Sequence, residues 1–183
     1  MSARHPRSAR VVAVVVTWLT LAAWLEVSEA QLSPSPFDAC QPATSQWSYD
    51  DLLCLHRAGL RHERMPEARA RLRQLGGGRD AHPWATLVLA HATLPDDETE
   101  AVRQYERAAR EFAGSGEADG EVIARQNLRI VYRRRGEVEA AAQQVRLAVA
   151  AAEASGAPLT LARASVLEAG HLMDSGSELG RAR

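Results

Sequence analysis

Small and apolar side chains recur at helical spacing along most of the chain after residue 46. Two stripes that lie forty residues apart share a 4-3-4 spacing, which places every member of a stripe on one face of an α-helix. Acidic residues precede each stripe, and a glycine, Gly116 or Gly156, follows it, as is typical of the two ends of a helix. The pattern predicts two long, equivalent helices. The stripe members are Ala101, Tyr105, Ala108 and Phe112 in the first helix and Ala141, Val145, Ala148 and Ala152 in the second.

Further helices of the same kind flank these two stripes. Pro66 opens a predicted helix about thirty-three residues before the first stripe, and Leu128 lies on another helix that ends near Gly136. Pro158 begins the last predicted helix, which we expect to end around Gly176. Self-similarity at spacings of about 33 to 40 residues indicates a helical repeat. The apolar positions are Ala68, Leu72 and Leu75 in the helix that Pro66 opens, and Leu161, Val166 and Leu172 in the last helix.

The first thirty residues are typical of a secretory signal peptide. Arginines precede an uncharged run over residues 11–25, and small residues stand before a cleavage point after Ala30. A helix over that run spans about 22 Å, less than the roughly 30 Å hydrocarbon core of a bilayer. The length favours the interpretation that residues 1–30 are a signal peptide that is cleaved. The alternative is that residues 11–25 are retained as a membrane anchor. Both predict that the rest of the chain is exported, to the periplasm or out of the cell.

Residues 31–46 contain three prolines and predict an extended, non-helical tether. Cys40 lies in this segment, and Cys54 follows fourteen positions later in the first predicted helix. In an oxidising compartment these two cysteines would form a disulfide that joins the tether to the helix. The alternative is that they are two unconnected small apolar residues.

Two patterns in the predicted hairpins repeat along the chain. The first helix of a hairpin carries a leucine and a tyrosine, and the second carries an alanine, a larger residue and another alanine. The matching residues are Leu128 and Tyr132 for the first pattern, and Ala101, Tyr105 and Ala108, then Ala141, Val145 and Ala148, for the second. Residues 47–183 therefore resemble the tetratricopeptide repeat family. The resemblance implies an all-α, right-handed superhelical solenoid of about three and a half helical hairpins. Arg129 departs from the family pattern, which has a small residue there.

Composition limits the classes of function. The 183 residues are 46% hydrophobic and 25% charged, which is ordinary for a folded domain, and the formal net charge is −1. All 22 basic residues are arginine. This balance gives no general reason to bind nucleic acid, and we expect contact with a membrane only through residues 1–30 if they are not cleaved. Two cysteines are too few for a four-thiolate zinc site, and we expect neither a metal nor a cofactor.

No catalytic motif is complete in the sequence. Pro66 stands where a zinc-protease motif beginning at His62 and Glu63 needs its second histidine. Cys54 and His56 are two positions apart, about 200° around a helix, so they do not face each other. We therefore expect that the protein is not an enzyme. A hydrolase that uses Cys54 with His56 or His62 is the weaker alternative.

The strongest candidate for a functional site is a surface on the helix around Leu128. The resemblance implies that such helices line a concave groove, and it places Asn127 where family members hold a peptide backbone or a C-terminal carboxylate. The predicted peptide-binding residues are Gln126, Asn127, Ile130, Arg133 and Arg134. The alternative is a solvated, salt-bridged face made by Arg125, Arg129, Arg133 and Arg135 with Glu121, Glu137 and Glu139.

The expected function is therefore a non-catalytic scaffold that binds an extended peptide or a helix of a partner protein. The alternative is a regulatory repeat segment of a longer protein, with a caspase-like protease or a kinase domain downstream of this N-terminal fragment. The last helix of a repeat array needs a polar outer face. The chain stops where the second helix of a fourth hairpin is expected. We therefore expect that a partner or further chain covers this end.

Overall fold

The computed structural model describes residues 35–42, 46–77 and 82–181, with only the backbone described for residues 175–181. The predicted signal peptide or anchor within residues 1–30 lies outside these ranges. The described residues form α-helices and one 3₁₀ turn and contain no strand, so the predicted all-α class is confirmed for them. None of the described helices combines the length and the apolar character that a membrane-spanning helix needs.

Seven α-helices follow the short turn in the described part of the chain. Their bounds are Asp38–Cys40 for the 3₁₀ turn η1, Tyr49–Arg61 for α2, Met65–Leu75 for α3, Pro83–Thr93 for α4, Glu98–Ser115 for α5, Ala118–Arg134 for α6, Val138–Ser155 for α7 and Pro158–Arg181 for α8.

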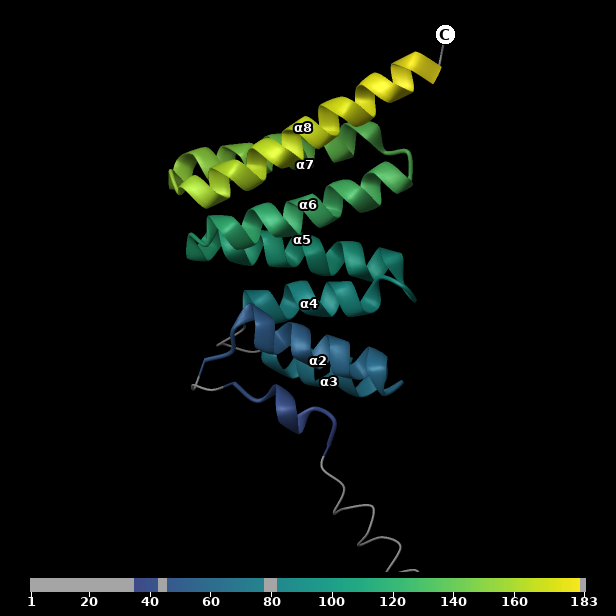
Figure 1. Cartoon of the computed structure of the whole chain (residues 1–183), viewed down its shortest axis with the longest axis vertical. Coiled ribbons are helices and arrows are strands. Elements are labelled where there is room, and N and C mark those ends of the chain that lie inside the picture. Colours follow the sequence, from purple (N-terminus) through teal and green to yellow (C-terminus); the bar gives the residue numbers. More distant parts are fainter. Residues whose placement is uncertain (1–34, 43–45, 78–81, 182–183) are drawn as a thin grey trace, which may run out of the picture.

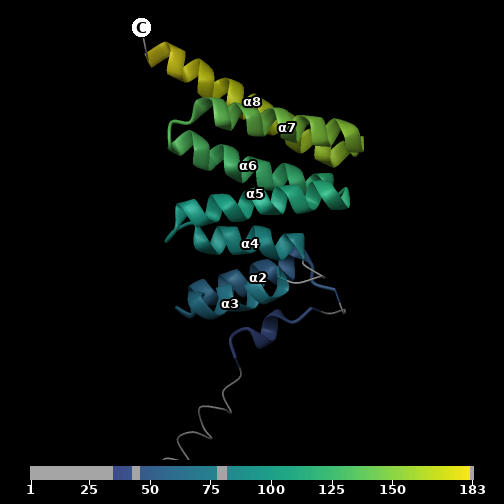
Figure 2. The same cartoon turned by 180° about the vertical axis from the view of Figure 1, so that it is seen from behind.

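The helices form a single stack in which each one packs against the next along the chain (Figures 1 and 2). The even-numbered helices also contact one another, because α2 packs on α4, α4 on α6 and α6 on α8. Within the described ranges, no two odd-numbered helices pack to a comparable extent. The two sides of the stack therefore differ, since the even-numbered helices are closer together than the odd-numbered ones.

The two predicted stripes form the contact faces of α5 and α7. All four stripe residues of α5 are fully buried, and those of α7 are at most 4% exposed. Gly116 and Gly156 follow these helices with φ angles of 76° and 63°. A side chain at either position would strain this left-handed backbone conformation, which explains why glycine ends both helices.

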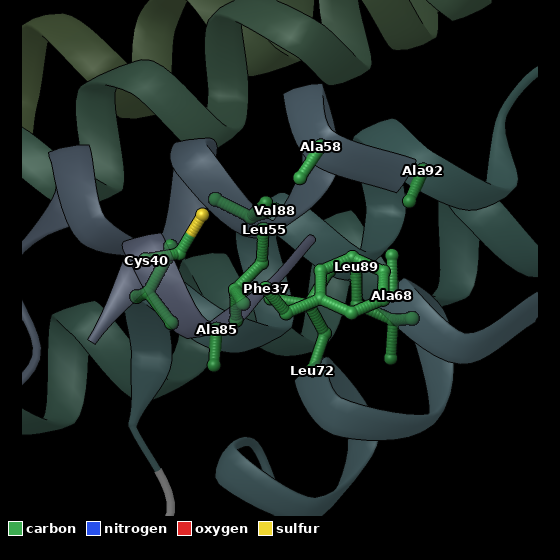
Figure 3. Packing of buried hydrophobic residues seen from close by; sticks show 11 residues of the cluster. Phe37, Cys40, Leu55, Ala58, Ala68, Leu72, Ala85, Val88, Leu89 and Ala92 are labelled. Carbon is green, nitrogen blue, oxygen red and sulfur yellow. The ribbon is translucent and has the colours of Figure 1, made fainter. Parts of the chain in front are cut away.

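Residues 35–42, the described part of the segment that the sequence predicted to be an extended tether, instead pack onto the first hairpin. Phe37 is fully buried and Cys40 is 2% exposed, and both lie in the η1 region. Figure 3 shows Phe37 among Leu55, Leu72 and Leu89, within the cluster of buried apolar side chains that η1, α2, α3 and α4 share. The prediction failed because it gave more weight to the prolines of the segment than to its single phenylalanine, whose burial contributes about 2 kcal/mol.

The two cysteines lie at disulfide distance. The sulfur atoms of Cys40 and Cys54 are 2.13 Å apart and their Cα atoms are 5.5 Å apart. The bond joins the η1 turn to α2, which is the pairing that the sequence predicted. A cysteine pair of this kind fits an oxidising compartment.

The last helix differs from the prediction in its length and in its buried face. It extends to Arg181 instead of ending around Gly176, because a glycine weakens a helix without ending it. Val166 and Leu172 are 72% and 64% exposed, so the predicted apolar face is wrong. Leu161, Val166 and Leu172 are separated by five and six residues, and side chains at these spacings do not lie on one face of a helix. The residues that pack onto the stack have 4-3 spacing and are Thr160, Ala164 and Leu167.

Candidate functional site

The structure places the five predicted binding residues on α6. Gln126, Ile130, Arg133 and Arg134 are exposed, and their spacing of 4, 3 and 1 puts them on one face of the helix. Asn127 lies beside this face and is half-buried. The four exposed residues form a continuous surface, which we call the α6 face and define as Gln126, Ile130, Arg133 and Arg134.

A pocket of about 400 Å³ opens at the C-terminal half of the α6 face. It is lined by Ile130, Arg133 and Arg134 together with Arg129, so it combines one apolar side chain with three guanidinium groups. Ile130 is 41% exposed, which leaves part of its side chain in contact with solvent. The combination suits a ligand that presents both an apolar group and a carboxylate.

The guanidinium groups at this pocket already have partners from neighbouring helices. Asp174 of α8 forms ion pairs with Arg133 and with Arg129, at 3.0 Å for the latter. Glu98 of α5 pairs with Arg134 at 2.8 Å. These pairs fit the alternative interpretation of a salt-bridged face, in which two of the three predicted acidic residues pair with predicted arginines and only Glu139 pairs with another one. Glu121 contacts Arg125, Glu137 contacts Arg135, and Glu139 contacts Arg146.

Asn127 makes contacts within the protein. Its Nδ2 atom donates to the carbonyl oxygen of Ile123 at 2.8 Å, and its side chain hydrogen-bonds His91 on α4. The His91 ring lies edge-on to Tyr105, with ring centroids 5.4 Å apart. Burial lowers the pKa of His91, and the hydrogen bond to Asn127 opposes part of that shift. Asn127 therefore connects α6 to α4, in addition to bordering the α6 face.

Arg129 is accommodated because its charge is paired. The side chain is only 12% exposed, and its guanidinium contacts Asp174 on the following even-numbered helix. Arg125 is similarly buried, at 14% exposure, and forms an ion pair of 2.6 Å with Glu121 on the same helix. Two arginines at positions where the repeat pattern expects small or apolar residues thus remain compatible with close helix packing.

While it is bonded to Cys40, Cys54 has no thiolate that could act as a nucleophile. His56 is half-buried, and burial together with Arg57 lowers its pKa. Within the ranges that the structure describes, no three His, Cys, Asp or Glu side chains are grouped closely enough to hold a metal ion.

A second pocket was missed by the sequence analysis. It has a volume of about 350 Å³ and lies between α3, α4 and α5. Four of its residues, Glu100, Arg103, Gln104 and Arg107, follow the i, i+3, i+4, i+7 spacing of a helical stripe, which was a usable signal. The contributions of α3 and α4 were not visible in the sequence, because they come together only through the packing of separate helices.

Comparison with known proteins finds no matching family model, no matching curated protein and no matching solved structure.

Proposed function

We propose that this protein is a non-catalytic scaffold, a tetratricopeptide-like superhelical solenoid that binds a peptide or helix of a partner protein along its even-numbered helices. The contacts of α4 with α2 and with α6 support this curvature, because the side on which alternate helices touch is the inner side of a curved stack. The hairpins α2–α3, α4–α5 and α6–α7, followed by α8, supply the number of helices that three and a half units of the proposed right-handed array require.

The α6 face is the observation that carries this proposal. It presents Ile130 beside Arg133 and Arg134 over a pocket of about 400 Å³, so that one helix face offers both apolar contact and positive charge. An extended peptide or a helix with an apolar side chain and a nearby carboxylate matches this surface.

The existing ion pairs do not block such a partner. The Arg133 and Arg134 side chains are 43% and 56% exposed, and exposed pairs of this kind contribute only about 0–1 kcal/mol each. A carboxylate of the partner therefore replaces Glu98 at Arg134 at small cost, while burial of Ile130 contributes additional binding energy.

The proposed location of the scaffold is outside the cytoplasm, either secreted or periplasmic. The cysteine pair at disulfide distance supports an oxidising compartment. Residues 1–30 have the sequence pattern of a signal peptide that would direct the chain there, or of an anchor if residues 11–25 are retained.

A second candidate function is a regulatory repeat segment that docks onto an effector domain of a longer protein, such as a caspase-like protease or a kinase. The apolar outer face of α8 favours it. Leu159, Val166 and Met173 recur at seven-residue spacing on that face and are between 65% and 72% exposed. A stripe of this kind suits contact with another helix.

The test selects partners of the α6 face from a library of random peptides displayed with free C-termini. Selected peptides are then measured by fluorescence anisotropy against the parent protein and two variants, Arg133→Glu and Ile130→Asp. We expect each variant to weaken binding by about tenfold or more. Arg110→Glu is the matched control, since Arg110 is an exposed arginine of α5 outside the α6 face. Equal binding by all four proteins would show that the α6 face is not the binding surface.

A further inference from the structure

The pocket between α3, α4 and α5 has a rim of arginines. Arg73 comes from α3, and Arg103 and Arg107 come from α5. Glu100 is the one carboxylate among the lining residues, so the rim has a surplus of positive charge. A surplus of guanidinium groups at one small cavity favours the binding of a ligand that carries an anionic oxygen group.

The three guanidinium groups differ in how far they are already engaged. Arg103 contacts Glu100 through two nitrogen atoms, at 2.8 and 2.5 Å. Arg107 donates to the carbonyl oxygen of Gly76 at 2.8 Å and pairs with Glu111. Arg73 makes no hydrogen bond or ion pair with any residue in the described ranges, which leaves its donors available for a ligand.

The floor of the pocket is polar, although it lies in an apolar stack. Thr86 is 2% exposed and Gln104 is 9% exposed, and Leu89 completes the floor. Neither Thr86 Oγ1 nor Gln104 Oε1 has a hydrogen-bond partner among the described residues. A buried polar atom without a hydrogen-bond partner destabilises the folded protein, so two of them beneath one pocket indicate that the floor serves something other than stability.

Glu100 determines which end of the Gln104 amide is left unpaired. Its Oε1 atom accepts from Gln104 Nε2 at 2.9 Å, and a carboxylate can pair only with the nitrogen end of the amide. The hydrogen bonds from Arg103 and Gln104 lower the pKa of Glu100, which keeps it ionised and able to hold this orientation. Gln104 Oε1 is therefore an acceptor that needs an O–H or N–H donor.

We propose that this pocket binds a small oxyanion that also carries hydroxyl groups, such as a sugar phosphate or a sugar acid. The anionic group lies among Arg73, Arg103 and Arg107, and hydroxyl groups of the ligand pair with Gln104 Oε1 and Thr86 Oγ1. The volume of about 350 Å³ is in the range of small-molecule sites. The Arg103 and Arg107 side chains are 62% and 50% exposed, so they can rotate to admit the ligand to the floor.

Isothermal titration calorimetry with complete and partial ligands tests the proposal. Glucose 6-phosphate and gluconate carry both an anionic group and hydroxyl groups, whereas inorganic phosphate and glucose each carry only one of these features. We expect at least one of the complete ligands to bind about tenfold or more tightly than either partial ligand. A preference between the two complete ligands distinguishes a phosphate from a carboxylate as the natural anionic group.

Three variants separate a specific site from general attraction to arginine. Arg73→Gln removes the guanidinium that has no partner among the described residues and is expected to weaken binding about tenfold with an unchanged melting temperature. Thr86→Val removes the hydroxyl at constant shape, and we expect weaker binding together with equal or higher stability of the protein alone. Arg110→Gln is the control, since it removes an exposed arginine of the same helix α5 outside the pocket.

Three outcomes would overturn the proposal. The first is that neither complete ligand binds at millimolar concentration. The second is that inorganic phosphate binds as tightly as glucose 6-phosphate. The third is that Arg110→Gln weakens binding as much as Arg73→Gln does, since binding would then depend on charge and not on the pocket.

Discussion

The ring of Phe112 lies against the backbone of Gly120, so that a Cβ atom at position 120 would be 2.4 Å from two ring carbons. The ring also meets Trp84 edge-on, with centroids 4.7 Å apart. Phe112 belongs to α5, Gly120 to α6 and Trp84 to α4. The absence of a side chain at Gly120 therefore allows three successive helices to meet around one aromatic ring.

Replacement of Gly120 by alanine should destabilise the protein. The added methyl group must displace a fully buried ring, and overpacking of this kind costs about 1–3 kcal/mol. Urea denaturation followed by circular dichroism measures the change. Gly114→Ala is the matched control, because a Cβ there meets nothing within 4 Å and alanine stabilises an exposed helix by about 0.5 kcal/mol. Equal effects of the two substitutions would contradict the packing argument.

Loss of the disulfide between Cys40 and Cys54 should lower the free energy of unfolding by about 3 kcal/mol, the value for a loop of this length. The comparison is between oxidised protein, protein in reducing agent and the double variant Cys40→Ala, Cys54→Ala. Reducing agent should destabilise the parent protein and leave the double variant unchanged. A parent protein whose denaturation midpoint is the same with and without reducing agent would show that the bond contributes nothing.

Stability should decrease as the pH falls below neutrality, because burial lowers the pKa of His91 in the folded protein. The unfolded chain, with an ordinary histidine pKa of about 6.5, then binds its proton first and is favoured as the pH decreases. The neutral His91 side chain makes its full contribution to stability above about pH 6.5, the ordinary histidine pKa of the unfolded chain. His91→Gln should reduce the dependence of the denaturation midpoint on pH between about 7.5 and 5.5. His62→Gln, at the exposed end of α2, is the control for the loss of an exposed histidine side chain.

Tyr132 should ionise only at strongly alkaline pH. Burial, together with the hydrogen bond of 2.8 Å that its hydroxyl donates to Glu106, raises its pKa to about 12. A raised pKa means that this stabilisation is complete below about pH 10 and is lost as the pH rises through the folded value. Ultraviolet titration of tyrosinate in the parent and in Tyr132→Phe identifies the signal. Glu106→Gln should lower the pKa, and ionisation of Tyr132 near pH 10 in the folded parent would contradict the assignment.

The sequence predicted the regular parts of the stack because each depended on residues close together in the chain. The stripe of α5 from Ala101 to Phe112 needed only the helical period, and Gly116 and Gly156 needed only the preference of glycine for left-handed backbone. The exposed residues of α6, from Gln126 to Arg134, were also predictable, since they form the polar side of a periodic pattern.

The features that were missed depend on contacts between distant segments. Phe37 is buried by α2 and α3, and nothing in the proline-rich sequence around it indicates that burial. Asp174 pairs with Arg129 across forty-five positions, so its role at the α6 pocket appears only when α8 packs on α6. The floor of the second pocket joins Thr86 to Gln104 in the same way.

The succession of neighbour contacts along the stack has a consequence for how the chain can change over time. The η1 turn contacts α2, and α8 contacts only α6 and α7 to any extent within the described ranges, so neither end depends on the other. Duplication or deletion of the α4–α5 hairpin alone would leave η1 on α2 and α8 on α6 and α7. The number of hairpins between these elements is therefore a quantity that recombination can alter without redesigning η1 or α8.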